Sequence, residues 1–294
     1  MDEITWVIVF AAIAGGSVAP FAKLALEVFH PFSLIFLRFS VATLSMLPFV
    51  LRHRELNLPT FRELLWVAAI GSLNPILLFI ALRFTPSSVS PLIYAGVPLM
   101  TAVFLHFFRH RQIRRAQVLG ILVGFVGVAL IIVLPFLQAG HVDLAGFWGN
   151  LLILGAAIAF MLYGVLSAEK QQQLNISPLS LTFYFALVTM LLSIPFAAYE
   201  LWGPGSAVAQ PAIGLKHVLS ALEIGLAGTS LFYFSYQFAI QRSNELTASL
   251  FTYLQPVAAI GFSVLLLSEK ITPPFLLGGA LAVLGAHLAS KARG

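Results

Sequence analysis

The stretch AIQRSNELTASLFTYLQPVAAIGFSVLLLSEKITPPFLLGGALAVLGAHL, at residues 239–288, decides the fold because the chain contains a second version of it. Residues 81–130 match it without a gap at a constant offset, so that Pro98 corresponds to Pro256 and Gly127 to Gly285. Each copy predicts an apolar helix with proline in its first half, a polar break, and a second apolar helix that carries glycine. An internal duplication of apolar sequence indicates a membrane protein built from repeats, with its site where the copies meet.

The composition excludes an ordinary soluble domain. Of the 294 residues, 60% are hydrophobic and 9% are charged, whereas soluble domains carry about 25% charged residues. We therefore expect a polytopic membrane protein surrounded by the lipid bilayer. The absence of cysteine excludes disulfides, thiolate metal sites and cysteine nucleophiles. The net charge of +5 comes from basic residues in short loops, which favours a topology signal over nucleic-acid binding.

Ten apolar runs are long enough, at roughly 20 residues each, to cross a bilayer. They lie near residues 4–24, 31–51, 63–82, 86–108, 115–136, 146–168, 178–199, 217–239, 245–267 and 273–290. A second match, at another fixed offset, pairs Pro31 with Pro178. Residues 1–136 and 146–290 are therefore interpreted as two copies of a five-helix unit. Because five is odd, the second copy enters from the opposite side, which predicts an all-α membrane protein with two inverted repeats.

The distribution of lysine and arginine predicts the orientation. One face carries Arg52, Arg54, Arg62, Arg109, Arg111, Arg114, Arg115, Lys170, Arg242, Lys291 and Arg293. The opposite face carries Lys23, Arg83, Lys216 and Lys270. The positive-inside rule then places both termini in the cytoplasm, for a multi-pass protein of the cell inner (plasma) membrane.

Four stretches carry a family resemblance: GGSVAPFAKLAL at 15–26, PFSLIFLRFSVATL at 31–44, ALRFTPSSVSPLIYAGVPLMTAVF at 81–104, and the opening stretch at 239–288. Together they resemble the drug/metabolite transporter superfamily, specifically its tandem EamA-type members, over nearly the whole chain. The resemblance implies ten helices, both termini inside, and transport of small metabolites, often as export. The family's acidic turn after the ninth helix is kept at Glu269, whereas the corresponding turn after the fourth helix reads His-Arg-Gln.

Arg38 and Glu223 are the charged residues most deeply placed in the predicted spans. An arginine at the bilayer centre costs about 2.5–3.5 kcal/mol on insertion scales, so Arg38 is a candidate anchor for an anionic substrate group. The alternative is a structural bond to carbonyls, or snorkelling to the interface. Glu223 lies at a similar depth and is the candidate for gating or proton coupling through an ion pair with Arg38. Its alternative is an interfacial glutamate at a helix start.

Several uncharged polar residues also fall inside the spans, where an unpartnered polar group is costly. Asn74 precedes a proline, so it either satisfies a freed carbonyl or offers its amide to substrate. Tyr233 and Gln237 are four residues apart and share a helix face. An interfacial aromatic belt is the alternative for tyrosines near span ends. The predicted substrate-binding set is Arg38, Asn74, Tyr94, Tyr233, Gln237, Tyr253 and Gln255.

Prolines inside the spans are candidate hinges. Pro20, Pro98 and Pro256 weaken backbone hydrogen bonding in helices that would have to rock against their neighbours. Packing alone is the competing explanation. The mixed set of tyrosine, glutamine and asparagine inside the spans suits a neutral or zwitterionic metabolite with an apolar part.

Chemistry other than transport finds little support in the sequence. Histidines lie in loops or at separate depths without clustered acids, and nucleotide-binding motifs are absent, so we expect no metal, no cofactor and no catalytic residue. The sequence predicts an inner-membrane secondary transporter that exports a small metabolite, such as an amino acid, by alternating access. A proton is the candidate coupling ion, and a monomer or homodimer is expected. The rival is a membrane-embedded enzyme acting on a lipid or isoprenoid.

Overall fold

The computed structural model describes residues 3–85, 89–139, 144–203, 212–267 and 273–291. Within these ranges every regular element is a helix, as the long apolar runs predict. The elements are α1 (Glu3–Ala25), α2 (Pro31–Arg52), α3 (Leu58–Ala81), α4 (Val89–Ala95), α5 (Val97–Arg109), α6 (Arg115–Ala139), α7 (Leu144–Leu174), α8 (Pro178–Trp202), α9 (Leu215–Gly225), η1 (Leu226–Leu231), α10 (Phe232–Arg242), α11 (Glu245–Ser249), α12 (Phe251–Leu267) and α13 (Pro273–Lys291).

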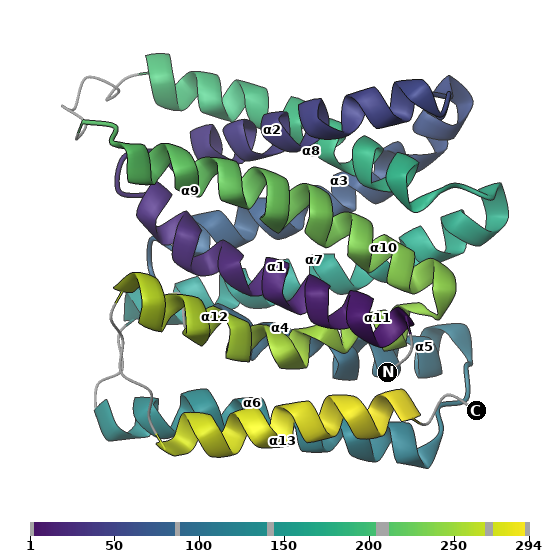
Figure 1. Cartoon of the computed structure of the whole chain (residues 1–294), viewed down its shortest axis with the longest axis vertical. Coiled ribbons are helices and arrows are strands. Elements are labelled where there is room, and N and C mark those ends of the chain that lie inside the picture. Colours follow the sequence, from purple (N-terminus) through teal and green to yellow (C-terminus); the bar gives the residue numbers. More distant parts are fainter. Residues whose placement is uncertain (1–2, 86–88, 140–143, 204–211, 268–272, 292–294) are drawn as a thin grey trace.

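The helices lie side by side with their axes in roughly one direction (Figure 1). Among the described residues, seven segments are long and apolar enough to cross a membrane. They are Glu3–Ala25, Pro31–Arg52, Leu58–Ala81, Phe147–Leu174, Pro178–Trp202, Leu215–Arg242 and Glu245–Leu266. Two shorter apolar helices, Ile93–Arg109 and Arg115–Gly127, accompany them. Large apolar side chains face outward, including Phe107 and Leu265, so the fold is that of a multi-pass membrane protein.

The first turn of α1 and the last turn of α13 lie at the same end of the helices, on the right in Figure 1. We call this the terminal end. The α5–α6 and α10–α11 turns also lie at the terminal end (Figure 1). An ion pair joins these two turns, since Arg111 Nη1 bonds Glu245 Oε1 at 2.7 Å. At the opposite end, the α1–α2 turn meets the start of α9, where Lys216 Nζ contacts Glu27 Oε2 at 2.6 Å. Each end therefore holds an ion pair between the first and the second half of the chain.

Prolines and small polar residues set where helices begin. Pro31 and Pro178 are the first residues of α2 and α8, a position where a backbone N–H is not needed. The Ser177 hydroxyl caps α8 by accepting a hydrogen bond from the backbone N–H of Ser180. The matched starts of α2 and α8 agree with the pairing of Pro31 and Pro178 in the sequence.

Three predicted spans are interrupted rather than continuous. The run 86–108 contains α4 and α5, separated at Gly96, and the run 245–267 contains α11 and α12, separated at Leu250. The run 217–239 contains the six-residue π-helix η1 between α9 and α10. The first break has a local cause: Pro98 has no backbone N–H to continue an α-helical ladder, so it falls in the first turn of a new helix.

The two halves pack through matched pairs of helices. Helix α2 packs on α8, and α6 packs on α13. Helix α3 packs on α7, and the corresponding contact joins α1 to α9 and α10. Helix α1 also packs on α12, and the corresponding contact joins α7 to α4 and α5. The α6–α13 pair forms one edge of the molecule (Figure 1). Its close approach requires glycine, since a Cβ atom on Gly285 would lie 2.2 Å from the backbone nitrogen of Gly124.

Candidate functional site

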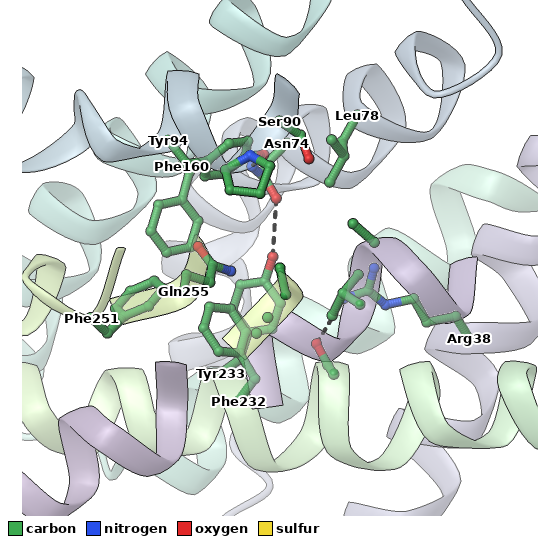
Figure 2. Close-up of a pocket in the computed structure, with 17 residues that line it drawn as sticks. Arg38, Asn74, Leu78, Ser90, Tyr94, Phe160, Phe232, Tyr233, Phe251 and Gln255 are labelled. Atoms are coloured by element: carbon green, nitrogen blue, oxygen red, sulfur yellow. Dashed lines mark hydrogen bonds between the residues drawn. The ribbon is translucent and has the colours of Figure 1, made fainter. Parts of the chain in front are cut away.

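A pocket lies between the first and the second half of the chain. Its volume is about 50 Å³. Residues from α1, α2, α3, α4, α7, η1, α10 and α12 enclose it (Figure 2). The lining residues are Gly15, Gly16, Val18, Ala19, Arg38, Asn74, Leu78, Ser90, Pro91, Tyr94, Phe160, Gly228, Phe232, Tyr233, Phe251, Gln255 and Ala259. Five predicted substrate-binding residues are among them: Arg38, Asn74, Tyr94, Tyr233 and Gln255.

Arg38 is the one charged side chain among the described residues that line the pocket, and it is only 3% exposed. Its Nη2 donates to the Gly228 carbonyl at 2.8 Å, and its Nε donates to the Thr229 hydroxyl. The guanidinium also lies 5.4 and 5.3 Å from the ring centroids of Phe39 and Phe79. These contacts fix the side chain at the pocket wall, and they include a bond to a backbone carbonyl of the kind that the structural alternative expects.

The π-helix η1 supplies both oxygen partners of Arg38. The Thr229 hydroxyl donates in turn to the Ile224 carbonyl, five residues earlier, at 2.7 Å. The Ser230 hydroxyl contacts the Gly225 carbonyl in the same way at 3.3 Å. A wide turn of this kind often marks a functional site. Sequence reasoning did not find η1, because its residues read as ordinary apolar helix.

Asn74 joins two tyrosines across the pocket. Its amide nitrogen donates to the Tyr94 hydroxyl and to the Ala156 carbonyl at 3.0 Å, and the Tyr233 hydroxyl donates to its Oδ1 at 3.1 Å. The amide thus bonds to α7 and not to a carbonyl freed by the neighbouring proline. Because Tyr94 accepts from Asn74, its own hydroxyl proton can be donated to another group.

Aromatic rings form the wall opposite Arg38 (Figure 2). The Phe232 centroid lies 5.1 Å from that of Phe251 and 4.9 Å from that of Tyr233, and the Phe160 centroid lies 5.9 Å from that of Phe251. Gln255 lies beside these rings, and its Oε1 is buried without a hydrogen-bond partner. The pocket thus combines a guanidinium, an apolar aromatic surface and an unused acceptor. The phenylalanines gave no sequence signal, because phenylalanine is common throughout this chain.

Two predicted binding residues lie outside the pocket. Gln237, one turn beyond Tyr233, bonds to the Ser167 hydroxyl and accepts from Gln171 at 2.6 Å. The Tyr253 hydroxyl donates to the Ile121 carbonyl at 2.7 Å. Both side chains are fully buried, so their polar groups join helices to one another. Their partners lie on distant helices, which sequence spacing does not reveal.

The predicted ion pair between Arg38 and Glu223 is not formed among the described residues. The Ser17 hydroxyl donates to Glu223 Oε1 at 2.5 Å, while Arg38 is directed to η1. The other carboxylate oxygen of Glu223 is buried without a partner. Glu223 therefore connects α9 to α1 near the pocket, and sequence reasoning missed Ser17 as its partner.

The predicted hinge prolines differ in their positions. Pro20 and Pro256 lie inside α1 and α12, where each interrupts backbone hydrogen bonding. Pro98 lies in the first turn of α5, just after the break at Gly96. Glu269 of the acidic turn lies outside the described residues, whereas Arg111 of the corresponding turn pairs with the buried Glu245.

Comparisons with known proteins agree with this architecture. The model of the EamA-like transporter family matches the chain twice, at residues 3–133 and 147–291. An uncharacterized transporter of Clostridium kluyveri is 22% identical over 87% of this chain and 82% of its own. An S-adenosylmethionine uptake transporter of Rickettsia bellii is 28% identical over 58% of this chain and 56% of its own. A solved crystal structure matches 97% of both chains with a TM-score of 0.75 at 22% identity, and shares the fold.

Proposed function

Because the chain belongs to the EamA-like transporter family, we propose that it is a secondary transporter of a small anionic or zwitterionic metabolite. The observation that carries the proposal is the buried guanidinium of Arg38, held by η1 in a pocket between the halves. A buried charge is retained in a membrane protein where it binds or moves a substrate or ion. The aromatic wall would contact the apolar part of the substrate, as in an amino acid.

The proposed mechanism is alternating access between two inverted five-helix repeats. Ligand pockets usually occupy about 300–1,000 Å³, while the observed pocket holds about 50 Å³, so binding a metabolite requires the helices to separate. The pairs Arg111–Glu245 and Lys216–Glu27 join the halves at opposite ends. In the proposed cycle, the two ion pairs break alternately, so that the pocket opens at one end and then at the other. The helices α1 and α12 would bend at Pro20 and Pro256 during this change.

The orientation, direction and coupling complete the proposal. Both termini would lie on the cytoplasmic side of the inner membrane. The reason is the positive-inside rule, since the terminal end carries most of the arginines. Net export is proposed on the family resemblance, and uptake is the competing direction because the Rickettsia relative is named for uptake. Glu223, held by Ser17 near the pocket, is the proposed proton-coupling group. The proposed assembly is a monomer or a homodimer.

A transport panel in proteoliposomes tests the proposal. Amino acids, nucleosides, sugars and S-adenosylmethionine would be loaded singly, with and without a pH gradient, and efflux compared with influx. We expect flux of at least one carboxylate-bearing compound, reduced by Arg38→Gln. Mass spectrometry of lipids and isoprenoids added to the same vesicles separates transport from the membrane-enzyme alternative, which would change the mass of such a substrate. Flux of none of these compounds, or flux that is unaffected by Arg38→Gln, would contradict the proposed site.

A further inference from the structure

A second pocket, of about 380 Å³, opens at the terminal end of the molecule. It lies between the first turn of α1, the α5–α6 turn and the α10–α11 turn. The lining residues are Ile4, Gln112, Arg114, Gln117, Arg242, Ser243, Asn244 and Thr247. Apart from Ile4 these are all polar or charged, so the pocket differs in character from the aromatic substrate pocket.

The two arginines of this terminal pocket are not neutralised. Among the described residues, neither Arg114 nor Arg242 forms an ion pair, although Arg242 lies over the Phe238 ring at 5.2 Å from its centroid. The neighbouring arginines are engaged, since Arg109 pairs with Glu169 and Arg111 pairs with the buried Glu245. The terminal pocket therefore holds two positive charges, while the nearby carboxylates of Glu169 and Glu245 are paired with other arginines.

Uncharged polar groups at the terminal pocket supply hydrogen-bonding capacity beside these two charges. Thr247 is fully buried, lines the terminal pocket, and its hydroxyl has no hydrogen-bond partner. Asn244 accepts from the Thr247 backbone N–H through Oδ1 at 2.8 Å, which leaves its NH₂ group as a donor. The amides of Gln112 and Gln117 are further donors. Guanidinium and amide donors around one space suit an oxyanion with several acceptor oxygens.

We propose that the terminal pocket binds a phosphate group, either free or in the headgroup of an anionic phospholipid. Arginine forks bind phosphate oxygens in pairs of charge-assisted hydrogen bonds. Basic pockets between helix ends at the cytoplasmic surface are known sites for lipid headgroups. Arg114 directly precedes α6 and Arg242 ends α10, so both lie at helix ends on the terminal side of the molecule. The bound phosphate would link the two halves across the terminal end, because the arginines belong to different repeats.

Binding measurements on the purified full chain test this site without a transport readout. In one arm, inorganic phosphate is titrated calorimetrically into protein in phosphatidylcholine nanodiscs. In the other, native mass spectrometry counts phosphatidylglycerol retained from mixed-lipid nanodiscs. Binding in the first arm identifies a free anion, and binding in the second alone identifies a lipid headgroup. We expect the double variant Arg114→Gln, Arg242→Gln to weaken binding by roughly tenfold to a hundredfold, since one lost hydrogen bond to a charged group weakens affinity by about tenfold and the variant removes two arginines.

A matched control separates the terminal pocket from general surface charge. The double variant Arg115→Gln, Arg62→Gln removes two exposed arginines that do not line the pocket. We expect it to bind like the wild type. Thr247→Val, which keeps the side-chain shape, should weaken binding a few-fold even if the arginine variant fails to fold. An equal loss in both double variants, or no binding in either arm, would overturn the proposal.

Discussion

Replacing Arg38 by glutamine should weaken substrate binding by roughly 10- to 100-fold, because a hydrogen bond to a charged group contributes about 1.5–3 kcal/mol. The structure supports this magnitude. The guanidinium has five N–H donors, of which one bonds Thr229 and one bonds Gly228. The remaining donors lie at the pocket, where Arg38 is the charged group among the described lining residues. Glutamine is shorter and neutral, so it would bind the same anionic group weakly.

The assay is the concentration dependence of flux in proteoliposomes, using the radiolabelled compound that the panel selects. Thr229→Val removes the Nε acceptor while keeping the charge, and should raise KM only a few-fold by loosening the guanidinium. Arg52→Gln removes an exposed arginine at the end of the same helix and should leave KM unchanged. Thermal unfolding of each variant separates binding from stability. An Arg38→Gln protein that folds with a lower melting temperature and an unchanged KM would show that Arg38 only braces η1.

Three further results are expected. Gly285→Ala should destabilise the protein by about 1–3 kcal/mol through overpacking against α6, seen as a lower melting temperature, whereas Gly261→Ala, at a position with open space, should not. Glu223→Gln should abolish the response of flux to an imposed pH gradient, and a preserved response would exclude Glu223 as the coupling group. The hydrogen bond from Lys216 lowers the pKa of Glu27. Ionised Glu27 therefore stabilises the fold above the ordinary glutamate pKa, and this contribution is lost as the pH falls through the lowered value. The melting temperatures of Glu27→Gln and wild type should consequently differ at neutral pH and converge in acid, and a constant difference would refute this linkage.

The sequence predicted the apolar helices well, because hydrophobic length is a local property. It also predicted that Arg38, Asn74 and Tyr233 meet at one pocket, because polar groups inside apolar spans avoid lipid. It did not distinguish these residues from Gln237, which is equally polar and equally buried. The difference depends on Ser167 and Gln171, which α7 brings to Gln237 but not to the pocket.

Backbone irregularities were the other features that sequence reasoning did not find. Pro98 marks one helix break, but the break at Leu250 and the π-helix at Leu226–Leu231 have no proline beside them. These features depend on contacts made after folding, such as the bond from Arg38 to Gly228. The phenylalanine wall was missed for a related reason: a ring facing lipid and a ring facing a pocket look alike in a hydropathy pattern.

The wide turn η1 accommodates one residue more than a regular turn of α-helix. Deleting one residue from Leu226–Leu231 would therefore let the segment close as a regular helix and leave α10 in its present phase, with Tyr233 still facing Asn74. The Gly228 carbonyl and the Thr229 hydroxyl would no longer meet Arg38 as they do now. A single-residue deletion at this point would thus take the support from the guanidinium while the aromatic wall stays in place.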